Sequence, residues 1–121
     1  MNKFENNYDL EERTTVFSEN LIDLYKKCPK DVITIPLIDQ GLRSGTSIGA
    51  NYCEANGASS KKDFKNKIFT CKKEGKETMY WLRLLEKALG NKQLKEDCGK
   101  LWQEAKELTL IFSKIAFSTK I

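Results

Sequence analysis

The chain has 121 residues and a mass of 13.9 kDa, a size that suits one domain with a single hydrophobic core. Its apolar fraction of 40% and charged fraction of 31% are typical of a folded protein, and its formal net charge is +4. The sequence contains no histidine, which excludes histidine-dependent catalytic triads and the familiar zinc sites.

The sequence also lacks signals for membranes and redox chemistry. No stretch approaches the roughly 20 apolar residues that cross a bilayer, and the opening MNKFENNYDLEER has no apolar segment behind a basic end. We therefore expect a cytoplasmic protein that is neither exported nor inserted into a membrane. No two of the four cysteines have the C-x-x-C spacing, so we expect reduced thiols in or near the core, no metal site and no cofactor. These cysteines are Cys28, Cys53, Cys71 and Cys98.

The first predicted helix spans residues 9–28. Asp9 can cap it, with Glu12 at the reciprocal position of a capping box, and Pro29 ends it. Apolar residues recur at alternating steps of four and three, the spacing that keeps one seam of a helix against its neighbours. The seam consists of Leu10, Thr14, Phe17, Leu21, Leu24 and Cys28.

The second predicted helix spans residues 36–56, after a connector over residues 30–35. Pro36 suits a first helical turn, where its missing amide hydrogen is not needed. The pair Asn56-Gly57 predicts a left-handed stop. The seam residues expected here are Ile38, Leu42, Gly45, Gly49 and Tyr52.

This second helix has few charges and many small residues. Each interior glycine costs about 0.5–1 kcal/mol relative to alanine, so three of them favour close packing over a merely weakened helix. Arg43 and Glu54 are interpreted as a polar pair across a subunit contact, with exposed rim charges as the alternative. The small residues are Gly41, Gly45 and Gly49, beside a second strip of Ser44, Ile48, Asn51 and Ala55.

Two further helices are predicted over residues 61–89 and 92–117. Ser60 with Asp63 forms a plausible capping box, Gly90 closes the third helix, and Asn91 can cap the fourth. Short connections make an antiparallel, up-and-down four-helix bundle the expected all-α fold, in preference to one long coiled coil. The third seam is Phe64, Ile68, Cys71, Gly75, Thr78, Leu82, Leu85 and Leu89, and the fourth is Leu94, Cys98, Leu101, Ala105, Leu108, Phe112 and Ile115.

Residues 61–95 carry most of the positive charge, with eleven Lys or Arg against four Asp or Glu. Six of the cations fall in a stripe about 80° wide along the third helix, with Phe69, Met79 and Tyr80 on or beside it. Such a surface can bind nucleic acid, because cations neutralise phosphates and aromatic rings stack on bases. The alternative is a solvated lysine face whose apolar neighbours are buried in an oligomer. The stripe consists of Lys61, Lys65, Lys72, Lys76, Arg83 and Lys87.

Three runs in the chain carry a family resemblance. LRSGTSIGANYCEA (residues 42–55), SKKDFKNKI (60–68) and KETMYWLRLLEKA (76–88) resemble the four-helix bundle family of 23S rRNA intervening-sequence proteins. The chain is also similar to the accessory proteins of diversity-generating retroelement reverse transcriptases. The resemblance implies a homo-oligomer in bacterial cytoplasm, typically a five-membered ring without known enzymatic activity. For the retroelement relatives it implies binding of the reverse transcriptase and of nucleic acid through a basic surface.

The family motif gives candidate residues for assembly. We expect a non-enzymatic oligomeric scaffold that binds RNA or a nucleic-acid enzyme through the stripe of the third helix. A purely structural or protein-interaction ring is the main alternative, and an enzyme that uses lysine chemistry is a third. The matches in the second helix, expected at the oligomer interface, are Arg43, Gly45, Ser47, Gly49, Asn51 and Glu54.

Overall fold

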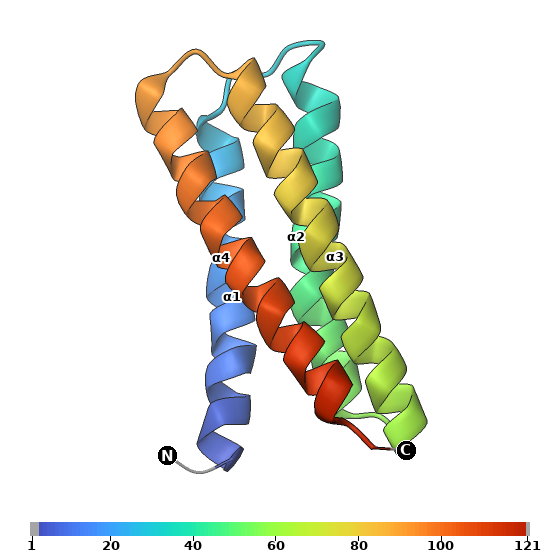
Figure 1. Ribbon diagram of the computed structural model, residues 1–121. Helices are drawn as coiled ribbons and strands as arrows, with labels where there is room; N and C mark the ends of the chain where they lie inside the picture. Colours follow the sequence, from blue (N-terminus) through green and yellow to red (C-terminus); the bar gives the residue numbers. More distant parts are fainter. Residues whose placement is uncertain (1–2, 121) are drawn as a thin grey trace.

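The computed structural model describes the backbone of residues 3–120 and the side chains of residues 10–120. Within that range the chain forms four helices that alternate in direction, so that α1 begins and α4 ends at the same end of the molecule (Figure 1). No helix there combines the length and apolar character needed to cross a bilayer. The helices are α1 (Lys3–Lys27), α2 (Thr34–Asn56), α3 (Lys61–Ala88) and α4 (Lys92–Ser118).

The helices pack in chain order around one core. α2 packs closely on α3 and α3 on α4, whereas α1 contacts α2 and α4 less extensively. Figure 1 shows α4 diverging from α1 toward the end where α1 begins. The diagonal helices meet through side chains, such as Tyr52 of α2 and Phe112 of α4, whose ring centroids lie 5.5 Å apart. The predicted up-and-down bundle is therefore confirmed.

The predicted seams of α1, α3 and α4 form the core. All six seam residues of α1 are buried, and only Phe64 and Ile115 of the other two seams are half-buried. The predicted seam of α2 contains one wrong residue, because Leu42 is 37% exposed. The buried residues of α2 also include Gly41, Ser44 and Ile48, which lie beside that seam. The small residues of α2 face its neighbours, so the size of an apolar side chain did not identify the buried face.

The glycines allow close approach between helices of the same chain. A Cβ at Gly45 would collide with Leu21 of α1, and a Cβ at Gly75 would collide with the Oγ1 of Thr109 on α4. Gly49 is similarly tight, since its Cβ would lie 3.2 Å from the Oγ1 of Thr14. A Cβ at Gly41 would likewise collide with the hydroxyl of Tyr25. The packing role predicted for Gly41, Gly45 and Gly49 is therefore confirmed, and the helix that approaches them is α1, whereas Gly75 is approached by α4.

The helix starts differ from the prediction at two places. α1 begins at Lys3, so Asp9 lies inside the helix and its capping box with Glu12 is wrong. α2 begins at Thr34, which leaves Pro36 in the first turn as expected. The residue that caps this start is Asp31, whose Oδ1 accepts the N–H groups of Ile33 and Thr34 at 2.9 Å. These hydrogen bonds hold the pKa of Asp31 below its usual range.

The other helix ends follow local side-chain chemistry. Ser60 accepts the N–H of Asp63 at 3.1 Å and Asn91 accepts the N–H of Leu94 at 2.9 Å, which confirms both as caps. The left-handed stop at Gly57 is wrong, since its φ is −100° and its N–H donates to Glu54 O. α3 ends at Ala88 because Leu89 turns to extended backbone, one residue before the glycine predicted to close it.

The contact between Gly75 and Thr109 can be tested by adding one methyl group. Gly75→Ala is expected to lower the free energy of unfolding by about 1–3 kcal/mol, because Thr109 is buried and its hydroxyl donates to Ala105 O at 2.7 Å. Urea unfolding followed by circular dichroism measures this change.

Gly99 provides the matched control for this substitution. It lies within α4, and a Cβ there would meet no atom within 4 Å. Gly99→Ala is therefore expected to stabilise the protein by about 0.5–1 kcal/mol through helix propensity alone. The same sign of change at both positions would contradict the packing account.

Candidate nucleic-acid interface

The six cations of the predicted stripe lie along α3 with unequal exposure. Lys65 and Lys72 are half-buried and the other four are exposed. Among residues 10–120, none of the six forms an ion pair. Lys65 is nevertheless engaged, since its Nζ donates to Thr119 O at 3.2 Å and lies 6.0 Å from the Phe69 ring centroid. The stripe therefore presents mostly unneutralised charge.

α4 adds to this surface a cation that sequence reasoning missed. Lys106 lines a groove of about 350 Å³ together with Lys76, Met79 and Leu110. Its Nζ lies 5.6 Å from the ring centroid of Trp102, close enough for a cation–π contact. Periodicity places Lys106 on the same side of α4 as Thr109. Its position beside Lys76 depends on the pairing of α3 with α4, which the sequence pattern of one helix does not contain.

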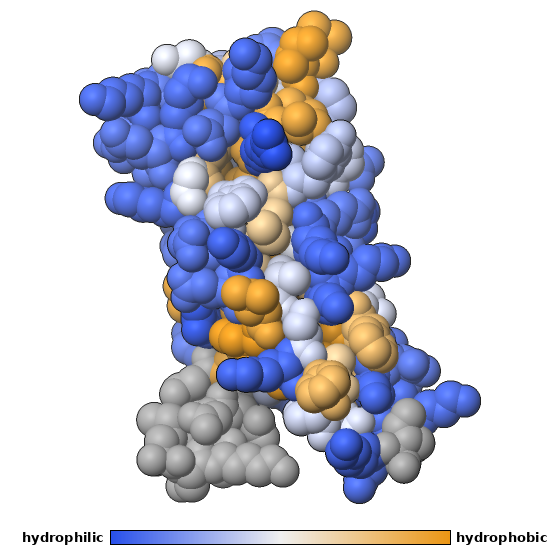
Figure 2. Space-filling view, viewed as in Figure 1, coloured by the Kyte–Doolittle hydropathy of each residue, from blue (hydrophilic) through white to orange (hydrophobic). Residues whose placement is uncertain are grey.

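We call this surface the α3–α4 face. Figure 2 shows hydrophilic side chains over most of α3 and α4, interrupted by separate hydrophobic spots. Exposed apolar side chains on these helices include Phe69 at 48% and Leu110 at 59%. Trp102 and Arg83 line a further hollow of about 270 Å³. The α3–α4 face comprises Lys72, Lys76, Met79, Arg83, Trp102, Lys106 and Leu110.

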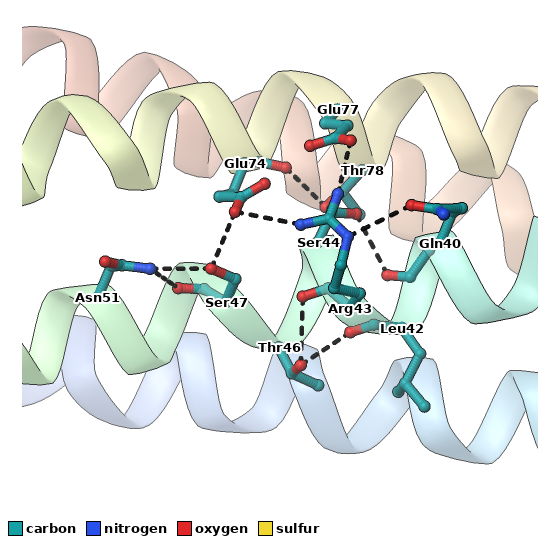
Figure 3. A network of polar contacts seen from close by, with 11 residues as sticks. Gln40, Leu42, Arg43, Ser44, Thr46, Ser47, Asn51, Glu74, Glu77 and Thr78 are labelled. Carbon is teal, nitrogen blue, oxygen red and sulfur yellow. Dashed lines mark hydrogen bonds and ion pairs between the residues drawn. The ribbon is translucent and has the colours of Figure 1, made fainter.

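The residues predicted at an oligomer interface are arranged differently. Arg43 donates to Glu77 at 2.6 Å and to Glu74 at 3.4 Å, both on α3, as Figure 3 shows. Glu54 pairs with Lys67 of α3 at 2.7 Å. Each of the two therefore has an ionic partner within the chain, and their pairing across a subunit contact stays a prediction.

The remaining four candidates also contact neighbours within the chain. Gly45 and Gly49 face α1, while Ser47 donates to Glu74 at 3.1 Å and Asn51 donates to Ser47 at 2.8 Å. These contacts explain why small and polar residues stand here. The role of the six residues in an oligomer stays a prediction.

Glu74 is the buried centre of this polar network. It is 7% exposed, and its Oε2 accepts from both Arg43 and Ser47. Its Oε1 and the Nε1 of Trp81 are buried without a hydrogen-bond partner among the described residues. The carboxylates of Glu74 and Glu77 thus both face the guanidinium of Arg43. The hydrogen bond from Arg43 holds the pKa of Glu77 below its usual range.

The cysteines show no sign of activation. Cys28, Cys71 and Cys98 are buried and Cys53 is exposed. Burial raises the pKa of Cys71 and of Cys98 to about 12, so both thiols are protonated at neutral pH. In the described part of the chain, no three cysteine or carboxylate side chains group as metal ligands would.

Removal of Arg43 is expected to leave Glu74 as a buried charge without its cation. Arg43→Met should lower the free energy of unfolding by about 1–3 kcal/mol, and adding Glu74→Met should recover most of the loss, because no buried charge then remains. Chemical denaturation of the single and double variants measures both changes.

Lys67→Met is the matched control, since its partner Glu54 has a 58% exposed side chain. Its effect should stay within about 0.5 kcal/mol, as for other exposed ion pairs. If the double variant Arg43→Met, Glu74→Met were no more stable than Arg43→Met alone, the burial of Glu74 without its cation would not be the cause of the lost stability.

Comparison with known proteins agrees with this architecture. The family described as 23S rRNA-intervening sequence protein matches residues 6–114. The crystal structure of a protein of unknown function from the S23 ribosomal protein family of Bacteroides thetaiotaomicron is similar, with a TM-score of 0.76 and 32% identity. The similarity covers 88% of this chain and 97% of that one. No curated protein matches. Because the family match spans nearly the whole chain and the bundle is shared, this chain belongs to the 23S rRNA-intervening sequence protein family.

Proposed function

We propose that this protein is a non-enzymatic, oligomeric scaffold that binds structured RNA through the α3–α4 face. The observation that carries the proposal is the state of the cations on that face. Lys72, Lys76 and Arg83 form no ion pair among the described residues, while Arg13 and Arg43 elsewhere are each held by two carboxylates. Free cations are what phosphate binding requires, because binding energy comes from releasing counterions from the nucleic acid.

The shape and composition of the face support RNA in particular. Lysines outnumber arginines there, which suits contacts to the sugar-phosphate backbone better than bidentate recognition of bases. Phe69, exposed on α3 beside Lys65, offers a ring on which unpaired bases can stack. A protein that combines both features binds helices with adjacent single-stranded loops. A nucleic-acid enzyme such as a reverse transcriptase would be recruited through the RNA that both proteins hold.

A protein-interaction ring is the second candidate, and the outward side of α2 favours it. Leu42 and Cys53 are exposed there, with the uncharged residues Thr46 and Ala50 on the same side. Arg43 and Glu54 do not interrupt this surface with free charge, because both pair with α3. The strip carries one exposed carboxylate, Asp39, at its start and is uncharged from Leu42 to Cys53. Such a strip with an exposed leucine suits contact between copies of the chain, for which we propose a pentamer in the cytoplasm.

RNA binding is expected to depend on the α3–α4 face. Changing Lys72, Lys76 and Lys106 together to Gln should weaken binding of a stem–loop RNA at least about tenfold and reduce the slope of log affinity against log salt by about 2. Fluorescence anisotropy across a salt series measures both quantities.

The matched control changes three exposed lysines on the α1 and α4 side, Lys26, Lys27 and Lys100, to Gln. It removes the same charge and should retain most of the affinity. An equal loss in both triple variants would indicate a net-charge effect only, and an absence of RNA binding by the wild type would refute the proposal.

Assembly is expected to depend on the outward side of α2. Sedimentation should give the wild type five times the chain mass of 13.9 kDa, and Leu42→Glu should sediment as a monomer with unchanged helicity. Leu110→Glu, at a residue 59% exposed on the α3–α4 face, should leave the pentamer intact. A monomeric wild type, or a pentamer formed by Leu42→Glu, would exclude this interface.

A further inference from the structure

One cavity lies at the end of the bundle where α2 ends, α3 begins and α4 ends (Figure 1). Its volume is about 620 Å³, within the range of pockets that hold small molecules. The residues that define its chemistry are Tyr52, Asn56, Lys61, Phe64, Thr119 and Lys120.

The charge of this cavity distinguishes it from the two hollows between α1 and α4. Two lysines and no carboxylate are among the described residues that line it. The hollow between α1 and α4, of about 530 Å³, includes Glu12 and Glu104, and its neighbour of about 260 Å³ includes Asp23 and Asp97. The cavity at the end of the bundle is therefore suited to an anion.

Its walls also offer an aromatic ring and neutral hydrogen-bonding groups. Phe64 is half-buried and packs against the core, so its ring is fixed in place. Burial raises the pKa of Tyr52, which keeps its phenol neutral. Asn56 donates to Glu11 at 2.7 Å through Nδ2, which leaves its Oδ1 as an acceptor. A ligand with a planar ring and an anionic group matches this combination.

Contacts to α3 and α4 fix Thr119, the residue before Lys120. The Nζ of Lys65 donates to Thr119 O at 3.2 Å, and the Oγ1 of Thr119 donates to Ile115 O at 2.7 Å. The residue before Lys120 is thus tied to both helices. Two lysines at one cavity match a terminal phosphate monoester, which carries about −1.5 to −2 charges at pH 7, better than an internal phosphodiester with one.

We infer that this cavity binds the 5′-terminal phosphorylated nucleotide of an RNA strand, with the phosphate at Lys61 and Lys120 and the base against Phe64. The inference rests on the proposed function, because Lys61 and Lys65 begin the basic stripe of α3 and an RNA on that stripe can extend to this end of the bundle. The cavity supplies recognition of an RNA end, which the open α3–α4 face does not.

The test compares one short single-stranded RNA, labelled at its 3′ end, with either a 5′-phosphate or a 5′-hydroxyl. The wild-type protein should bind the phosphorylated strand about fivefold more tightly, as expected for one charge-assisted contact. Lys120→Gln should remove this preference and leave the affinity for the hydroxyl strand nearly unchanged. Lys120 is chosen because it lies outside the stripe and is exposed, so the substitution does not disturb the core.

The control is Lys92→Gln, an equal charge change at an exposed residue at the opposite end of α4. It should keep the preference for the 5′-phosphate. Equal affinity of the wild type for both strands, or a preference that survives Lys120→Gln, would overturn the inference while leaving RNA binding by the α3–α4 face intact.

A third arm uses AMP and adenosine, so that failure of the proposed function and failure of the cavity can be told apart. AMP should shift the amide resonances of Phe64 and Lys120 in the wild type, adenosine should shift them less, and Lys120→Gln should abolish the AMP effect. If neither RNA binds but AMP does, the scaffold proposal fails and the cavity stands as a site for free nucleotides. If AMP does not bind, the cavity assignment is wrong whatever RNA does.

Discussion

The close approach of helices at three glycines, Gly41, Gly45 and Gly75, constrains how this bundle is arranged. Gly45 admits Leu21 of α1, and Gly75 admits Thr109 of α4, so that α2 and α3 each have a neighbour pressed against their backbone. α2 is consequently buried on its α1 side and its α3 side at once, which explains its small residues. The exposed cations of α3 lie beside its contact with α4, since the groove lined by Lys76 and Lys106 also includes Thr109. Packing thus decides which side chains are available for binding.

The polar contacts between α2 and α3 have an electrostatic consequence for the opposite flank of α3. Glu74 and Glu77 are two of the four acidic residues between residues 61 and 95, and both turn toward Arg43 on α2. Their charge is therefore used within the bundle and does not neutralise the lysines near α4. Lys72 and Lys76 remain without a carboxylate partner among the described residues. These carboxylates of α3 thus lie on its α2 side, in the network of Figure 3, and these two lysines lie on its α4 side.

Local signals in the sequence predicted more of this fold than signals that depend on neighbours. Heptad spacing gave the buried residues of α1, α3 and α4, and Ser60 and Asn91 were found because a cap acts within three residues. In α2 only Leu42 was misassigned, because its size outweighed neighbouring small residues whose burial depends on the approach of α1. The partners of Arg43 and the position of Lys106 depend on how two helices are aligned, which periodicity within one helix does not contain.

The lysine stripe of α3 forms one line in sequence but two environments in the structure. At the start of α3, the last residues of α4 close over the stripe, so that Lys61 lines a cavity and Lys65 holds Thr119. About three turns beyond Lys65, α4 presents Leu110 and Lys106 beside Lys76, and the surface is an open groove. An enclosed site selects a ligand by size and by the charge of one group, whereas an open basic groove binds along a backbone. The contact between α3 and α4 thus divides a uniform run of charge into a cavity at the end of the bundle and an open groove along it.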